Sequence, residues 1–184
     1  LLVCDGNTYR VAGKRVENLL EGKIGGRLIY PGESFVVPNE AAVADLTACV
    51  TAKTDLIVGV GSGVINDLCK YVSFDRQLDC GIVPTAPSMD GYASETSSMA
   101  RRGVKVSLPS RCASVIIGDT DILKNAPMKM LRSGLGDMLA KYVSICEWRI
   151  SHLITGEYYC EDIAQLIRSA LKRCTDNAAG LLKR

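Results

Sequence analysis

Between Leu1 and about Thr120, short runs of β-branched and other apolar residues alternate with stretches in which apolar residues recur every three or four positions. The short runs predict strands, and the longer stretches predict helices near residues 7–20, 39–53 and 64–77. Continuous apolar runs are typical of strands covered on both faces, so we expect a mostly parallel α/β sheet that binds ligands beyond the carboxyl ends of its strands. The predicted strands are Leu1–Cys4, Gly26–Tyr30, Asp55–Val60, Gly81–Pro84 and Ser114–Gly118.

Two further runs interrupt this alternation. Ser94–Met99 and Val104–Leu108 are separated by Arg101-Arg102-Gly103, a short stretch that ends in glycine. Two apolar runs joined this closely predict a β-hairpin. We expect it to be inserted into the α/β pattern.

The pattern becomes helical from about Asp121 onward. Apolar residues recur at three- and four-residue steps, which predicts long amphipathic helices. The last stripe reaches the end of the chain without a capping signal. We therefore expect an α/β domain over residues 1–120 and, over 121–184, the N-terminal part of an all-helical domain that is cut short. The opening residue is Leu rather than Met, so we expect a piece of a longer polypeptide.

Composition excludes several classes of protein. The chain has 184 residues, 47% of them hydrophobic and 23% charged, which is ordinary globular usage. A formal net charge of +2 leaves no strongly basic face for nucleic acid or an anionic membrane. No apolar run is long enough to span a membrane, and the first residues lack a signal-peptide pattern. We expect a soluble, cytoplasmic protein.

Cysteine and histidine usage argues against a metal cluster built from those residues. The eight cysteines form no CxxC motif and lie mostly in apolar segments, so we expect free, buried thiols. The single histidine, His152, falls near the end of a predicted helix, where a packed or C-terminal-turn residue is more common than a ligand. A Cys/His zinc site is poorly supported.

A glycine-rich stretch, Gly59-Val60-Gly61-Ser62-Gly63, follows one predicted strand and opens a helix. Backbone N–H groups at such a turn approach a phosphate closely, and the helix dipole favours its charge. The stretch fails both the GxGxxG and the GK[ST] patterns. A plain strand-to-helix turn capped by Ser62 or Asn66 is an equally good interpretation.

Two stretches carry acidic residues that could have either a local structural role or a role in the chemistry. Pro84–Ser94 follows the next strand, so we expect it beside the glycine loop, although Asp90-Gly91 is also an ordinary turn pair. Gly134–Tyr142 places Asp137 among apolar residues at an expected helix start. Asp137 is then either a cap with Lys141 as its i+4 partner or a metal-ligating carboxylate at a domain junction. The residues by themselves favour the turn and the cap.

Taken together, four stretches resemble the sn-glycerol-1-phosphate dehydrogenases, which belong to the superfamily of glycerol dehydrogenases, iron-containing alcohol dehydrogenases and dehydroquinate synthases. The most specific is the segment Pro84-Thr85-Ala86-Pro87-Ser88-Met89-Asp90-Gly91-Tyr92-Ala93-Ser94. The others are Gly61–Asp67, Gly136–Tyr142 and Ser151–Glu157. The resemblance implies a dehydroquinate synthase-like fold, in which a Rossmann-like sheet precedes a helical metal-binding domain.

The resemblance also implies an activity and a homodimer. The activity is NAD(H)- or NADP(H)-linked, reversible reduction of dihydroxyacetone phosphate to sn-glycerol 1-phosphate with a divalent metal, zinc or nickel. Asp137 would ligate the metal and touch the substrate, and Asp90 would contact the substrate. Asp5 would bind the adenosine ribose. The remaining cofactor contacts would come from Gly61, Ser62, Gly63, Val64, Ile65, Asn66 and Asp67 in the pyrophosphate loop, and from Thr85, Ala86, Pro87, Ser88 and Ser94.

One departure from the family pattern limits the activity expected of this segment. Family members complete the metal site with two histidines of the helical domain, and His152 is not taken to be one of them. We therefore expect the segment by itself to hold metal poorly and to be nearly inactive. The alternatives are a non-catalytic nucleotide-binding module and a dehydrogenase of another small polyol.

Candidate cations for the substrate phosphate are Arg101, Arg102, Lys105 and Lys141.

Overall fold

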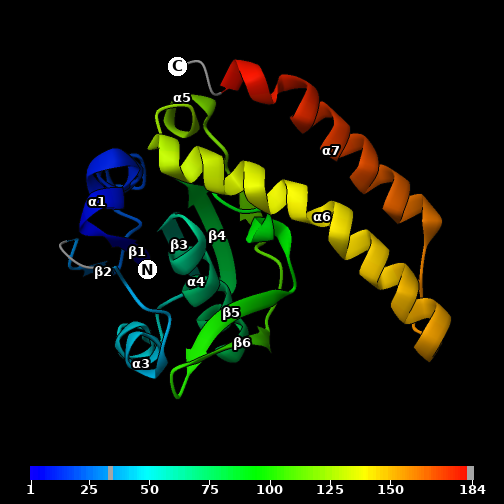
Figure 1. The fold of residues 1–184 in the computed structure, drawn as a ribbon. Helices are drawn as coiled ribbons and strands as arrows, with labels where there is room; N and C mark the ends of the chain where they lie inside the picture. The colour runs from blue at the N-terminus through cyan, green and yellow to red at the C-terminus, as the bar shows by residue number, and fades with distance from the viewer. Residues whose placement is uncertain (33–34, 182–184) are drawn as a thin grey trace. The chain divides into compact units, whose positions relative to one another are not determined.

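The computed structural model describes residues 1–32 and 35–181. Two compact units make up the chain (Figure 1). The first comprises Leu1–Pro87 and Gly91–Ala126, and the second comprises Ser88–Asp90 and Pro127–Arg184. The boundary predicted at residues 120/121 falls inside a short helix, α5, at Thr120–Leu123.

A five-stranded sheet in the order β2-β1-β3-β4-β7 forms the centre of the first unit. Every neighbouring pair of its strands is parallel, which confirms the predicted fold class. Each strand lies where the apolar runs predicted it. The bounds are β1 Leu2–Asp5, β2 Arg27–Tyr30, β3 Leu56–Gly61, β4 Asp79–Pro84 and β7 Val115–Ile116.

Helices follow the strands as expected. The first helical stretch is continuous through α1 Gly6–Thr8, the π-helical η1 Tyr9–Gly13 and α2 Lys14–Leu19. The next helix, α3, spans Glu40–Ala48 and begins there because the Asn39 side chain accepts a hydrogen bond from the Ala42 amide. The helix α4 spans Gly63–Asp75, and a short 3₁₀ turn, η2, spans Gly91–Ala93.

The two faces of the sheet bury alternate residues of each strand. Val3, Ile57 and Ile82 belong to a core cluster with residues of α3 and α4. Val60 and Val83 belong to a second cluster, which includes residues of η1 and α2. Because successive side chains of a strand point to opposite faces, this division shows that helices cover both sides of the sheet.

The predicted β-hairpin is present in the first unit. Its strands, β5 Thr96–Arg101 and β6 Val104–Pro109, pair antiparallel. The two turn residues, Arg102 and Gly103, have φ values of 50° and 77°, as a type I′ turn requires. Met99 is buried in the cluster that contains α3 and α4, so the hairpin packs on that side of the sheet.

Two long helices, α6 Met128–Thr155 and α7 Glu161–Leu181, form a hairpin in the second unit (Figure 1). Ile145, Ala164 and Leu171 are buried between them. The first of these helices ends at Thr155 and is capped by Gly156, where φ is 75° and the amide donates to the His152 carbonyl. His152 is therefore a residue of the last helical turn, as predicted.

The helix start predicted near Gly136 is wrong. The helix begins at Met128 and continues through both Gly134 and Gly136 for 28 residues. Asp137 consequently lies within the helix and cannot be its cap. The glycines misled because glycine is most often a helix breaker, whereas here the backbone of Gly134 is buried in the second unit.

The cysteines are free, as predicted, but their predicted burial is wrong for five of them, since Cys146 is exposed and Cys49, Cys112, Cys160 and Cys174 are partly exposed. Cys4, Cys69 and Cys80 are buried, and burial raises the pKa of each thiol, to about 12 for Cys4 and about 11 for Cys80. Over residues 1–32 and 35–181, no helix has the length and apolar character that crossing a membrane would need.

Candidate functional site

The strand order of the first unit contains one topological switch point. The chain leaves β1 for β2 on one side, and from β3 it continues to β4 and β7 on the other. Ligands of open α/β sheets bind outside the carboxyl ends of the strands at such a point. Here those ends are Asp5 and Gly61, so the glycine loop lies where the topology favours a ligand.

The glycine loop turns directly from β3 into α4. Ser62 occupies the N-cap position, but its side chain makes no capping hydrogen bond, so the predicted Ser62 cap is absent. The amides of the first helical turn point out of the helix toward its N-terminal end. A Cβ built on Gly61 would lie 2.7 Å from the Cβ of Ile65, which shows that the close packing of helix on strand requires glycine here.

The segment after β4 lies beside the glycine loop, as predicted. The Thr85 amide donates to the Gly61 carbonyl at 3.1 Å. Thr85 and Ala86 are buried, and the Tyr92 hydroxyl donates to the Ala86 carbonyl at 2.6 Å. Two motifs separated in the sequence therefore share one rim of the sheet.

Asp5 lies at the end of β1 and caps the helix that follows. Its Oδ1 accepts the amides of Asn7 at 2.8 Å and Thr8 at 2.9 Å. The next residue, Gly6, approaches the loop after β2, since a Cβ on Gly6 would lie 3.1 Å from the Gly32 nitrogen. This close approach of two loops beside Asp5 was not recognised from the sequence.

Two residues of the predicted pyrophosphate loop point into the protein. Asn66 is fully buried, and its Nδ2 donates to Asp67 Oδ1 at 3.0 Å, so it does not cap the helix. Asp67 Oδ2 accepts the amide of Ser98 in the hairpin at 3.1 Å. Burial raises the pKa of the Asp67 carboxyl. The Asp67 carboxylate therefore joins α4 to β5, and the Asn66 side chain is turned toward Asp67.

Lys70, a buried residue of α4, was not identified as a candidate from the sequence. Lys70 is fully buried and its ammonium contacts Ser94, a predicted cofactor residue, at 2.8 Å. The only signal in the sequence was its position three residues after Asp67, a spacing that brings the two side chains to one helix face.

The second unit brings three predicted residues together. Asp137 Oδ2 accepts the backbone amide of Asp90 at 2.8 Å. Lys141 Nζ forms an ion pair with Asp90 Oδ2 at 2.8 Å, and this hydrogen bond raises the pKa of Lys141. The predicted i+4 partner of Lys141 was Asp137, but its close partner is Asp90. Ser88, assigned to the cofactor, lies on the same short segment as Asp90.

The other candidate cations belong to the hairpin. Arg101 contacts the Tyr71 hydroxyl at 3.4 Å, and the Arg102 amide donates to Glu40 Oε1 at 3.2 Å. Lys105 lies on β6 opposite Ala100. The structure therefore pairs Lys141 with a predicted substrate residue, whereas the contacts of Arg101 and Arg102 are with α3 and α4.

The family model described as iron-containing alcohol dehydrogenase matches residues 1–127. The chain belongs to the iron-containing alcohol dehydrogenase family. The match covers the whole sheet, the glycine loop and the segment Pro84–Ser94, which contains Asp90. It confirms the superfamily that the motifs indicated.

Relatives and solved structures support this membership. Glycerol-1-phosphate dehydrogenase (NAD(P)+) of Bacillus subtilis (strain 168) is 36% identical over 181 residues, which are 96% of this chain and 46% of the relative. Glycerol dehydrogenase of Schizosaccharomyces pombe superposes with a TM-score of 0.64 at 25% identity, covering 77% of this chain and 36% of that one.

A probable glycerol dehydrogenase of Sinorhizobium meliloti 1021 has a TM-score of 0.77 at 19% identity. It covers 98% of this chain and 50% of its own, and at that identity it shows the fold. The chain spans about half the length of the curated relatives it matches.

The family name implies a metal ion. Among the described residues, no group of three His, Cys, Asp or Glu side chains is placed to hold a metal ion. Asp137 contributes carboxylate oxygens, and the cation beside Asp90 is a lysine. The residues described here do not by themselves fit a family metal centre.

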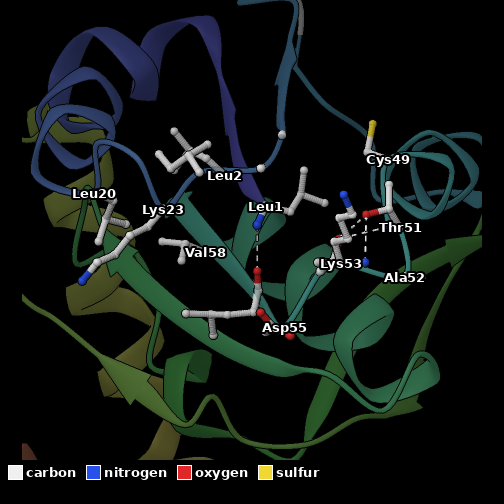
Figure 2. A pocket seen from close by; sticks show the side chains of 15 residues that line it. Leu1, Leu2, Leu20, Lys23, Cys49, Thr51, Ala52, Lys53, Asp55 and Val58 are labelled. Atoms are coloured by element: carbon white, nitrogen blue, oxygen red, sulfur yellow. Dashed lines mark hydrogen bonds between the residues drawn. The ribbon is translucent and has the colours of Figure 1, made fainter.

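A pocket of about 650 Å³ lies at the opposite end of the sheet (Figure 2). Leu1 lines it, and its amino group donates to the Leu56 carbonyl at 2.8 Å. Lys23, Lys53 and Asp55 add charged groups to the wall. Because this pocket is formed at the amino ends of β1 and β3, it is separate from the switch point and contains none of the motif residues.

Proposed function

We propose that this chain supplies the nucleotide-binding part of a dehydrogenase that reduces dihydroxyacetone phosphate reversibly to sn-glycerol 1-phosphate with NADH or NADPH. The observation that carries the proposal is the glycine loop at the switch point, joined by the hydrogen bond from Thr85 to Gly61 to the segment that leads to Asp90. The names of the relatives supply the substrate class.

The residues of the first unit bind and orient the cofactor in this proposal. The amides that begin α4 face the pyrophosphate, and Asp5 at the end of β1 faces the adenosine ribose. Thr85, Ala86 and Pro87 line the path toward the nicotinamide. When bound, NADH or NADPH would supply the hydride that reduces the carbonyl of dihydroxyacetone phosphate, and solvent water would supply the proton of the new hydroxyl.

Asp90, Asp137 and Lys141 act on the substrate in this proposal. The Asp90 carboxylate accepts a hydrogen bond from a substrate hydroxyl, while Lys141 holds that carboxylate by its 2.8 Å ion pair. The same ammonium is a cation within reach of an anionic substrate group bound at Asp90. Asp137 fixes the Asp90 backbone and is the residue that would ligate zinc or nickel. Among the described residues, the donors that would complete a site for that ion are not assembled.

A second candidate, a nucleotide-binding module without catalysis, is favoured by that same donor set. A third keeps the family but changes the substrate to another small polyol. The proposal includes a homodimer in the cytoplasm, as the resemblance implies. Sedimentation of the natural protein tests the dimer.

The deciding experiment uses the natural protein that carries this chain. Oxidation of NADH and of NADPH is followed by absorbance with dihydroxyacetone phosphate or dihydroxyacetone as the acceptor. Turnover of the phosphate with a much higher kcat/KM supports the proposal. Binding of NADH without turnover of either acceptor favours the non-catalytic module, and preference for dihydroxyacetone favours the polyol dehydrogenase.

A further inference from the structure

Lys70 is the largest fully buried side chain among the described residues of the first unit, on the face of α4 that packs against the hairpin. Burying an ammonium costs several kcal/mol unless its donors are satisfied. The neighbours of Lys70 in the sequence, Cys69 and Tyr71, both pack in the apolar core cluster. Because this ammonium is buried, it cannot serve to solvate the surface of the helix.

All three donors of the Lys70 ammonium meet acceptors from one short segment. Nζ lies 3.2 Å from the Gly91 carbonyl, 2.8 Å from Ser94 Oγ and 2.8 Å from the Thr96 carbonyl. Ser94 Oγ itself lies 2.9 Å from each of these two carbonyls. The Lys70 ammonium and the Ser94 hydroxyl thus hold residues 91–96 together through one small group of hydrogen bonds.

The charge is held chiefly by these neutral acceptors. The nearest carboxylate oxygen, Asp67 Oδ1, lies 4.0 Å from Nζ. Burial lowers the pKa of Lys70, and Asp67 acts in the opposite direction. Asp67 in turn binds the Ser98 amide, so two charged residues of one helix anchor the chain from Gly91 to Ser98.

We propose that Lys70 is a positioning residue for Asp90. The Gly91 carbonyl that Lys70 binds belongs to the residue directly after Asp90, so fixing it restricts the backbone on the C-terminal side of that acid. Lys70 has no direct contact with substrate or cofactor in this proposal. Lys70 determines the position of the Asp90 carboxylate. The inference rests on the proposed function only for the identity of the reaction in which Asp90 takes part.

The test compares Lys70→Met, Lys70→Arg and Ser94→Ala in the natural protein, with Lys53→Met at an exposed loop position as the control. Methionine keeps the apolar stem but removes the ammonium that donates to Gly91, Ser94 and Thr96. We expect kcat/KM for dihydroxyacetone phosphate to fall by about 10²-fold, as for a misplacement of about 1 Å. The loss should appear mainly in kcat, and the dissociation constant of NADH should stay within about twofold of the unmodified protein.

Two further measurements separate positioning from general stability. Amide hydrogen exchange over residues 91–98 should accelerate by about tenfold in Lys70→Met, while exchange in β3 stays unchanged. Lys70→Arg restores the charge and part of the kcat, and Ser94→Ala gives an intermediate loss. Unchanged exchange at 91–98 overturns the inference, as does a kcat equal to that of the Lys53→Met control.

The exchange experiment also distinguishes failure of this inference from failure of the proposed function. If the natural protein does not reduce dihydroxyacetone phosphate, the proposed function fails, but selective acceleration at residues 91–98 still supports positioning by Lys70. If the protein is active and Lys70→Met leaves both kcat and exchange unchanged, the inference fails and the proposed function stands. Should Lys70→Met not fold, Ser94→Ala decides by the exchange at residues 91–98 alone, because Ser94 is also a predicted cofactor contact and its kcat does not separate the two roles.

Discussion

The backbone amide of Asp90 donates to the Asp137 carboxylate at 2.8 Å, across a sequence separation of 47 residues. A helix residue and a loop residue that the motifs had indicated separately are therefore held together in one unit. The amide fixes one oxygen of Asp137, and the Lys141 ammonium fixes one oxygen of Asp90. Each carboxylate therefore has a partner of its own, the Asp90 amide for Asp137 and the Lys141 ammonium for Asp90.

Metal retention tests the assignment of Asp137. We expect the 184-residue chain to keep well below one zinc or nickel ion per molecule after dialysis, because a catalytic site takes about three protein ligands. In the natural protein, Asp137→Asn should lose the metal and Asp176→Asn, an exposed acid of α7, should retain it. Metal content by plasma mass spectrometry is the measurement. Stoichiometric metal on the 184-residue chain would contradict the prediction.

The ion pair between Lys141 and Asp90 predicts a dependence of stability on alkaline pH. The hydrogen bond to Asp90 raises the folded-state pKa of Lys141 above 10.5, so its contribution is present below that pH and lost as pH rises through the folded value. Both side chains are partly exposed, and solvent screening limits the contribution to about 0.5 kcal/mol. Urea unfolding of the natural protein and of Lys141→Met at pH 9 and pH 12 checks this. A difference that grows with pH has the wrong sign.

Replacement of Gly61 by Ala should damage both packing and cofactor binding. The new Cβ would meet Ile65 at 2.7 Å and push the start of α4 away from β3. Such overpacking costs about 1–3 kcal/mol, and the displaced amides should weaken NADH binding. Gly81→Ala on the neighbouring strand is the matched control, since its Cβ would have no neighbour within 4 Å. Thermal unfolding and NADH fluorescence give the two readouts, and equal behaviour of the two variants would refute the packing argument.

Four of the eight cysteines should differ sharply in their rate of reaction with iodoacetamide. The backbone amide of Ile163, and then the Tyr158 side chain, lower the pKa of Cys160. Burial instead raises the pKa of Cys4, Cys69 and Cys80. At pH 7 we expect Cys160 to be alkylated first and the three buried thiols only after unfolding, as mass spectrometry of peptides will show. Loss of the fastest phase in Cys160→Ser confirms the assignment, whereas native labelling of Cys4 at the same rate excludes it.

The strands and the hairpin could be predicted because their signals are local. The strand over Leu56–Gly61 is a continuous apolar run, and the hairpin is marked by Arg102-Gly103. The glycine loop was also visible, because a parallel sheet places it at the carboxyl edge. By contrast, the start of α6 was misplaced, because Gly134 and Gly136 are tolerated inside a long helix.

The role of Lys70 could not be predicted, because it depends on contacts with residues 91–96 that are more than 20 positions away. A lysine in an amphipathic helix reads as a solvent-facing residue, and only packing shows that it is buried. The inward direction of Asn66 was hidden for the same reason. Its place in the family motif suggested a cofactor contact, and its burial directs the amide toward Asp67.

The division of the chain into units has a consequence for dissecting the protein. The chain passes from the first unit to the second at Pro87–Ser88, returns at Asp90–Gly91 and leaves again at Ala126–Pro127. A protein ended at Ala126 would keep the sheet but would separate Asp90 from both Asp137 and Lys141. No single cut therefore yields two intact halves, and the acid pair forms only when both parts belong to one continuous polypeptide or are supplied to each other as complementing fragments.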